Sequence, residues 1–372
     1  MGDIMKGIYV IFDSINNLKK NYQGVYKKIE AQVNVFNEEN LNTKLYFIEY
    51  NRGKLNKIAR RLPFDLFINN IQLPKNIDVD FFYIRKGLLN YPFIKFLREI
   101  KLQNPNCKIL LEIPTFPYDN EINKSIKNLP LYIKDKFYRN ILYKYVDRIV
   151  TFSKDEKIFG IPTINISNGV EISKIRVRKP VNSKGINIIA VASFDFWHGY
   201  DRFIKGLGEY YQHGGKESIY FHVVGDGRVL PYYKKLVEKY NLGDRVIFYG
   251  FKTGKELDLI YDKCEIALDA MGRHRSGVYF NSSIKGKEYA AKGLPIISGV
   301  RTELDDNPDF KYYFRVPANE TPIDIREVIK FYKNVYSDKS HNAVIWEIRK
   351  YAEKQFDIHE CMKPVVQYIK FS

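Results

Sequence analysis

Short apolar runs alternate with amphipathic stretches along the whole chain. A run such as CKILLEI (107–113) indicates a strand buried on both faces of a sheet. Between such runs, apolar residues recur every three or four positions, as Ile29, Val33 and Phe36 do, which is typical of helices. The expected strands are 7–12, 44–50, 78–85, 107–113, 147–153, 163–166, 186–193, 218–225, 246–250, 265–270 and 295–299. The expected helices are 26–40, 92–101, 123–145, 202–211, 231–240, 256–264, 284–292 and 340–369.

This alternation predicts an α/β protein with two domains. Strands that alternate with helices form parallel sheets joined by right-handed crossovers. The pattern restarts after the polar stretch 171–185, which is the expected linker between doubly wound domains at 1–170 and 186–350. We expect 351–372 to be a C-terminal helix that packs back on the N-terminal domain. The expected site is the cleft where the two domains face each other, at the carboxyl ends of the strands.

Composition narrows the class of protein further. The three cysteines are scattered, which fits neither a disulfide framework nor a metal site and suits a reducing cytoplasm. No apolar stretch is long enough to span a membrane. The net charge of +17 favours phosphate-bearing substrates or an anionic membrane surface, or else reflects a solvated lysine-rich surface. No zinc-finger spacing or basic region with heptads is present, so no nucleic-acid partner is predicted.

The stretch IKGKEYAAKGLPIISG (284–299) carries the clearest candidate chemistry. Asparagine and two serines precede it as N-cap residues, and Gly-Leu-Pro ends the predicted helix. The start of a helix attracts phosphate, and a ligand phosphate would relieve the misplaced cation Lys285 in its first turn. One turn further, the carboxylate of Glu288 can accept hydrogen bonds from a ribose diol. The alternative is that Lys285 and Glu288 form a surface ion pair.

Three other loops are predicted to meet at the same place. The loop 192–202 joins a strand to a helix, and a Gly-Asp-Gly turn (225–227) lets a ligand approach the backbone. The cationic loop 269–280 lies directly before the helix and contains Arg-His-Arg (273–275), whose side chains either contact phosphates or are solvated.

Together these stretches resemble a known family. VASFDFWHGYDR, VVGDG, RVIFYG, ELDLIYDKCEIAL and SSIKGKEYAAKGLPIISG, in this order and spacing, are similar to the donor-binding domain of glycosyltransferase family 4, whose members have the two-domain, Rossmann-like GT-B fold. First-domain segments of the family resemble YQGVYKKIEAQVNVF (22–36) and ISNGVEI (166–172). LLEIPTFPYDNE (110–121) resembles a strand-to-loop segment common in its polysaccharide-building members. The resemblance covers about 20–360.

The resemblance implies a retaining glycosyltransferase of glycan biosynthesis. It would move a hexose-type sugar from a nucleotide diphosphate sugar, most often a UDP-sugar in this family, to a surface glycan or to a lipid-linked or protein acceptor. The donor is a substrate, so no cofactor is implied, and no metal-binding Asp-x-Asp context is evident. The protein would work in the cytoplasm, with the inner face of the membrane as a further location.

The resemblance also assigns residues. Glu288 matches the second glutamate of the family's Glu-x7-Glu motif, which binds ribose. The implied donor-binding residues are Glu288, Lys285, Ser282, Ser283, Ile284, Gly225, Asp226, Gly227, His198, Ser193, Arg273 and Arg275. The implied catalytic candidates are Glu112, Asp119 and His274, and the acceptor-side candidates are Gln23 and Gly24.

The sequence departs from the family pattern at three positions. Phe280 stands where the first motif glutamate is expected, and Ser193 and His198 stand where the family commonly has an arginine and a lysine. These departures favour an alternative, a non-catalytic GT-B-like partner that binds glycan or polypeptide and assists another transferase. A nucleotide-sugar epimerase is the third hypothesis, which the absence of a recognisable histidine and acidic pattern disfavours.

Overall fold

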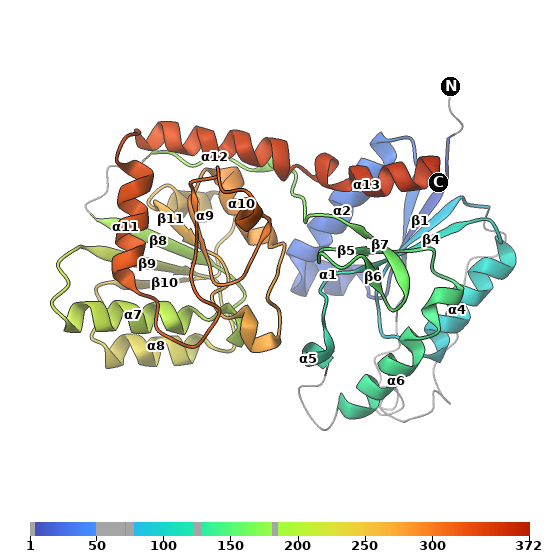
Figure 1. Cartoon of the computed structure of the whole chain (residues 1–372), viewed down its shortest axis with the longest axis horizontal. Helices are drawn as coiled ribbons and strands as arrows, with labels where there is room; N and C mark the ends of the chain where they lie inside the picture. The colour runs from blue at the N-terminus through green and yellow to red at the C-terminus, as the bar shows by residue number, and fades with distance from the viewer. Residues whose placement is uncertain (1–3, 50–70, 72–77, 123–127, 181–184) are drawn as a thin grey trace. The chain divides into compact units, whose positions relative to one another are not determined.

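The computed structural model describes residues 4–49, 71, 78–122, 128–180 and 185–372, which fall into two compact units (Figure 1). The first unit consists of Met1–Gly169 together with Ile358–Ser372, and the second of Val170–Asp357. The predicted linker 171–185 begins inside the second unit, because Ile172 is buried in the core of that unit.

The first unit is built on a sheet of order β2-β1-β3-β4-β5-β7-β6. Its strands are parallel except that β6 pairs antiparallel with β7. Alternate residues of β3 enter different cores, Phe81 and Tyr83 on one face and Phe82 and Ile84 on the other. Both faces are therefore apolar, as a sheet covered on two sides requires. The strands are β1 (Gly7–Ile11), β2 (Thr43–Phe47), β3 (Phe81–Arg85), β4 (Lys108–Ile113), β5 (Arg148–Thr151), β6 (Lys157–Ile158) and β7 (Ile161–Asn165).

Helices cover both faces of this sheet. On one face, α13 packs beside α2, and their apolar side chains fill a core with Tyr9 and Tyr83 (Figure 1). On the other face α4 contributes Phe93, Phe96 and Leu97. The helices of the first unit are α1 (Ile15–Asn21), α2 (Gln23–Glu38), α4 (Tyr91–Gln103), α5 (Asp119–Ile122), α6 (Leu129–Arg139), the 3-10 turn η2 (Leu142–Lys144) and α13 (Ile358–Phe371).

The second unit has an all-parallel sheet of order β10-β9-β8-β11-β12-β13. Numbered within the unit this order is 3-2-1-4-5-6, the doubly wound arrangement of dinucleotide-binding domains. The chain reverses its direction of winding between β8 and β11, and the loops after those two strands flank the resulting crevice. The strands are β8 (Ile186–Val191), β9 (Ile219–Val224), β10 (Val246–Gly250), β11 (Ile266–Leu268), β12 (Ile296–Ser298) and β13 (Tyr313–Arg315).

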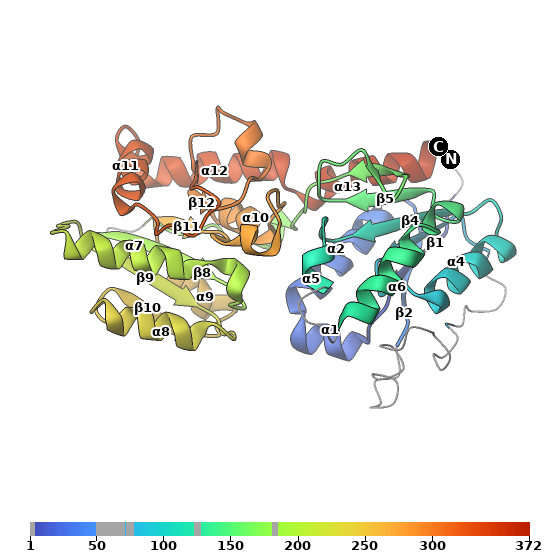
Figure 2. The same ribbon diagram turned by 60° about the horizontal axis from the view of Figure 1, so that its bottom comes forward.

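The helices of this unit pair up on the sheet. Helix α7 packs against α8, and α10 packs against α12 (Figures 1 and 2). The α-helices are α7 (Tyr200–Gln212), α8 (Leu230–Lys239), α9 (Gly254–Tyr261), α10 (Ile284–Lys292), α11 (Ile325–Tyr336) and α12 (His341–Gln355). The 3-10 turns are η3 (Ile172–Lys174), η4 (Phe196–His198), η5 (Arg273–Ser276) and η6 (Glu303–Asp306).

The predicted fold class, two doubly wound α/β domains, is confirmed. The segment 340–369, which is expected to be helical, forms two helices, because the chain leaves the helical conformation at Phe356 and Asp357. There the Val170 N–H donates to the Phe356 carbonyl over 3.0 Å, and Val170 bridges Asp357. The chain passes from the second unit to the first at this point.

Candidate functional site

The loops after β8 and β11 are held together at the crevice of the second sheet. The Met271 N–H donates to the His198 carbonyl over 2.7 Å. Gly199 has a φ of 64°, and a Cβ there would lie 2.5 Å from the Gly272 backbone nitrogen. Glycine at 199 is therefore required by both its conformation and the close approach of the two loops. The loop after β8 thus has a fixed position at the mouth of the crevice.

The Gly-Asp-Gly turn after β9 packs against that same loop. The Phe194 N–H donates to the Asp226 carbonyl over 2.7 Å. A Cβ on Gly225 would lie 1.9 Å from the Ala192 carbonyl oxygen, and one on Gly227 would lie 2.0 Å from the Phe194 oxygen. The sequence suggested that these glycines admit a ligand, and the structure supplies a second reason for them, the contact between two backbones.

A substitution at this turn is expected to destabilise the second unit. Gly225→Ala should lower the free energy of unfolding by about 2–3 kcal/mol, because the φ of 125° is strained for alanine and the methyl group meets a carbonyl oxygen. Gly243→Ala is the matched control, since no atom lies within 4 Å of its added Cβ. Urea unfolding followed by tryptophan fluorescence measures both, and equal midpoints for the two variants would contradict the packing argument.

Helix α10 begins at a serine that joins it to the sheet. The Ser283 hydroxyl accepts from the Gly286 N–H over 3.3 Å and donates to Oδ1 of Asp269 over 2.8 Å. Asp269 directly follows β11 and is buried, as is Ser282. Ile284 and Lys285 occupy the first two positions of the helix, whose N–H groups have no intrahelical acceptor. The serines and the isoleucine predicted from sequence are therefore brought together at one helix start.

Two basic side chains face each other beside this helix start. Nζ of Lys285 lies 2.7 Å from Nε2 of His198. Nδ1 of His198 accepts from the Asp195 N–H over 2.9 Å, so the neutral ring carries its proton on Nε2, toward the lysine. Burial, with the charges of Lys285 and Arg273, lowers the pKa of His198 to about 2. Burial and Arg273 also lower the pKa of Lys285, against the opposing charge of Asp269.

The side of Ser283 away from His198 and Lys285 is closed to a phosphate. On that side, a cavity bounded by Asp269, Thr302 and Tyr313 has a volume of about 10 Å³. That volume holds about one water and no phosphate.

The other two residues of the predicted Arg-His-Arg loop are engaged within the protein. Arg275 forms two hydrogen bonds to the Asp201 carboxylate, at 2.9 and 3.0 Å, and two to Glu320, at 2.8 and 2.6 Å. Nε2 of His274 contacts the same Glu320 over 2.6 Å. Hydrogen bonds from Arg275 and His274 lower the pKa of Glu320 to about 2 despite the effect of burial. These contacts tie η5 to the 320 loop.

The remaining donor-side candidates are accessible. Glu288 is exposed on α10, one turn after Lys285, and Ser193 is exposed in the loop after β8. The carboxylate of Asp226 accepts from the Gly227 N–H over 2.7 Å.

The predicted residues of the first unit lie in different settings. Glu112, the fifth residue of β4, is fully buried. Asp119 begins α5 and forms a 2.9 Å ion pair with Arg139. Gly24 is exposed near the start of α2, and a Cβ there would meet no atom within 4 Å. The side chain of Gln23 lies outside the described residues.

Comparison with known proteins shows which family part of the chain resembles and which fold the whole chain has. The family described as "Glycosyl transferases group 1" matches residues 171–273. A glycosyltransferase from Rickettsia africae is 13% identical with a TM-score of 0.61, over 100% of both chains. Anabaena HepE in complex with UDP is 12% identical with a TM-score of 0.62, over 98% of this chain and 99% of that chain. The chain has the GT-B fold.

Other solved structures agree with the GT-B assignment. Sucrose-phosphate synthase from Thermosynechococcus elongatus is 11% identical with a TM-score of 0.63, over 98% of this chain and 97% of that chain. Sequence identities this low establish a shared fold and not a shared function. No curated protein matches the chain significantly by sequence.

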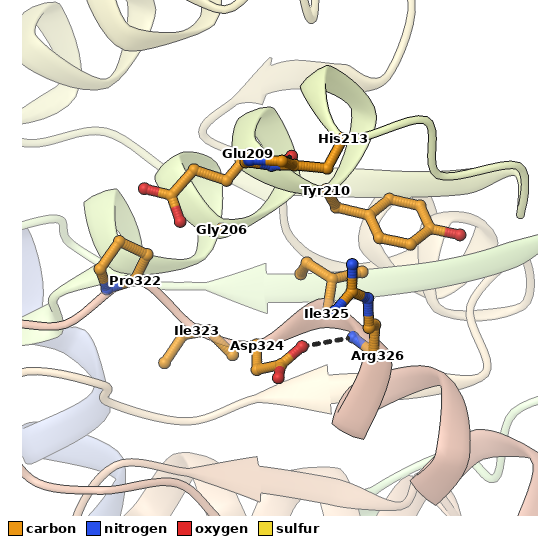
Figure 3. Close-up of a pocket in the computed structure, with 9 residues that line it drawn as sticks. All are labelled: Gly206, Glu209, Tyr210, His213, Pro322, Ile323, Asp324, Ile325 and Arg326. Atoms are coloured by element: carbon orange, nitrogen blue, oxygen red, sulfur yellow. Dashed lines mark hydrogen bonds between the residues drawn. The ribbon is translucent and has the colours of Figure 1, made fainter.

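The second unit of this GT-B chain has another hollow, which neither Lys285 nor His198 lines. It has a volume of about 360 Å³ and lies between the second half of α7 and the start of α11 (Figure 3). Glu209, Asp324 and Arg326 give its lining charges of both signs, and Tyr210 lines it as well. None of the site residues predicted from sequence lines it.

Sequence reasoning missed several residues of the site. Asp269 follows the apolar run of β11 directly, and this position at a strand end was a usable signal. For Glu320 the sequence gives no such signal, since its partners Arg275 and His274 are 45 and 46 positions away along the chain. Within the described ranges, no group of three or more His, Cys, Asp or Glu side chains can hold a metal ion. In the same part of the chain, no helix is both long enough and apolar enough to cross a membrane.

Proposed function

We propose that this protein is a retaining glycosyltransferase of the family 4 type, which uses a nucleotide diphosphate sugar. The observation that carries the proposal is the 2.7 Å contact between Lys285 and His198 at the start of α10. The buried His198 ring and the half-buried Lys285 amine lie side by side, and an added anion would stabilise both. A diphosphate placed there would accept from each, and from the first N–H groups of the helix.

The proposed chemistry relies on charge stabilisation. As the bond between the sugar and the diphosphate breaks, negative charge grows on the leaving group. Lys285, His198 and the positive end of α10 stabilise that charge, which lowers the barrier to transfer. We propose that these groups take the role that a metal ion has in other transferases, so that catalysis is metal-independent.

The donor is proposed to be a UDP-hexose. UDP is favoured because the structurally similar Anabaena HepE is described in complex with UDP and with UDP-glucose. The acceptor is proposed to be a surface glycan or glycoconjugate reached from the cytoplasm at the inner face of the membrane, on the side of the first unit. Among the catalytic candidates, Asp119 lies at the carboxyl side of the first sheet, while His274 is held by Glu320.

Glu288 is predicted to bind the ribose of the donor. Glu288→Ala should weaken UDP binding about tenfold, because a charged acceptor of two hydroxyl hydrogen bonds is lost, and it should leave the thermal unfolding midpoint unchanged. Titration calorimetry with UDP, GDP and their sugar conjugates measures the affinity and names the base. Glu327→Ala is the matched control, an exposed glutamate on α11. Equal UDP affinity in the Glu288 variant and the control would contradict the ribose assignment.

A second function has one observation in its favour. Phe280 stands where the family has its first motif glutamate, and its backbone bridges Arg301. A non-catalytic partner of another transferase would tolerate that change. Hydrolysis or transfer of the bound donor sugar separates the two functions, since a partner protein would do neither.

A further inference from the structure

Helix α6 buries three of its charged side chains and exposes a stripe of apolar ones. Lys134, Asp135 and Arg139 are buried. Leu129, Ile133 and Phe137, one on each successive turn, are 43%, 58% and 62% exposed. This is the reverse of the pattern of a helix that packs on a core by its apolar face.

The inward charges fix the rotation of the helix. Oδ1 of Asp135 accepts from the Tyr118 hydroxyl over 2.8 Å and from Nε of Arg139 over 3.0 Å. Lys86, which follows β3, lies 3.4 Å from the other oxygen of Asp135. Turning the helix to bury its apolar face would expose these groups and break their ion pairs. The apolar face is therefore held outward by the fold.

Exposed basic and aromatic residues accompany the apolar face, on α6 and in the turn η2 that follows it. Lys136 is exposed on α6, with its Nζ 4.7 Å from the centre of the Tyr132 ring. Tyr143 is 60% exposed in η2, and Lys144 next to it is exposed. Of the four basic residues in 128–145, Lys134 and Arg139 are buried, whereas Lys136 and Lys144 are exposed. Tyrosine and lysine around an apolar stripe are the composition of helices that lie in the headgroup region of a bilayer.

We propose that α6 is the membrane-docking element of this protein, which inserts Leu129, Ile133 and Phe137 into an anionic bilayer surface while Lys136 and Lys144 contact lipid phosphates. Charge complementarity favours an anionic bilayer over a second copy of the protein as the partner of this helix. A second copy would bring two basic rims together in a protein of net charge +17, whereas anionic lipid attracts the same rims. This inference deepens the proposed function, because it supplies the surface from which a lipid-linked acceptor would be reached.

Vesicle sedimentation without nucleotide tests the docking element. The full chain should bind phosphatidylglycerol–phosphatidylcholine vesicles more tightly than pure phosphatidylcholine vesicles, and salt should weaken the binding. The triple variant Leu129→Ser/Ile133→Ser/Phe137→Ser should partition into the vesicles at least about 100-fold less, since it lacks the three apolar side chains that insert into the bilayer. The control Leu102→Ser/Phe251→Ser/Leu259→Ser, at positions 68%, 73% and 63% exposed elsewhere, should bind like the wild type.

Insertion is distinguished from adsorption by a tryptophan probe. Phe137→Trp in a background with both native tryptophans replaced by phenylalanine should be quenched by lipids brominated in the acyl chains. Vesicle binding unaffected by the triple serine substitution would overturn the proposal, as would a mass change in solution showing that the stripe joins two copies. UDP binding is measured separately on the same variants, so a failure of docking and a failure of the donor site are distinguishable.

Discussion

Glu112→Ala is expected to lower the free energy of unfolding of the first unit by about 3–5 kcal/mol, the cost of leaving buried charges without their partner. Oε2 of Glu112 accepts from the Tyr83 hydroxyl over 2.7 Å and from Nε2 of Gln32 over 2.8 Å. Oε1 forms ion pairs with Arg85 and, over 3.5 Å, with Lys28. The carboxylate thus connects α2, β3 and β4, and its removal would leave two cations facing each other in the interior.

The measurement uses the distribution of tryptophan in the chain. Both tryptophans, Trp197 and Trp346, belong to the second unit, so their fluorescence reports on that unit, while circular dichroism reports on both. In Glu112→Ala the dichroism transition should move to lower urea while the fluorescence transition stays in place. Glu360→Ala, which removes an exposed glutamate on α13, is the control and should cost less than about 0.5 kcal/mol. Coincident, unshifted transitions in Glu112→Ala would contradict the expectation.

The same carboxylate makes stability depend on pH. Burial would raise the pKa of Glu112, but Lys28 and Arg85, with hydrogen bonds from Tyr83 and Gln32, lower it from the ordinary 4.5 to about 2. The unfolded chain therefore binds the proton first. The contribution of Glu112 is fully present above the unfolded pKa and is lost as the pH falls from there through about 2. Glu112→Gln should remove that part of the pH dependence.

The strands could be predicted from the sequence, because parallel strands that are buried on both faces consist of continuous apolar runs. The runs 107–113 and 186–193 correspond to β4 and β8 with their ends shifted by two residues or fewer. Both ends of α10 could also be predicted, since Ser283 caps its start and Gly293 ends it in the left-handed conformation. Local chemistry sufficed in each case.

Contacts between residues far apart in the chain could not be predicted from the sequence. The pattern of α6 is amphipathic in either orientation, and contacts with Tyr118, Lys86 and Asp119 hold its buried charges inward. Similarly, nothing near Arg275 in the sequence shows that Asp201 and Glu320 occupy its guanidinium. Two of the three side chains that could contact phosphate, His274 and Arg275, are therefore engaged by carboxylates of the protein.

Lys285→Ala is expected to weaken UDP binding by about 10- to 100-fold, or about 1.4–2.7 kcal/mol, because a charged hydrogen bond to the diphosphate is lost. The loss should be smaller for UMP and absent for uridine, since the lysine is predicted to contact phosphate and not the nucleoside. Lys285→Arg should restore part of the affinity by keeping the charge. Lys330→Ala, at an exposed lysine on α11, serves as the control and should bind UDP like the wild type.

Proton uptake gives this prediction a second readout. Burial and Arg273 lower the pKa of Lys285 in the free protein, and a bound diphosphate would raise it again. Between those two pKa values, UDP binding must therefore take up a proton, so the calorimetric enthalpy should change with the ionisation enthalpy of the buffer. That dependence should disappear in Lys285→Ala, where no amine remains to be protonated. Undiminished UDP affinity together with unchanged proton uptake in Lys285→Ala would place the diphosphate elsewhere and remove the main support for a donor site at the start of α10.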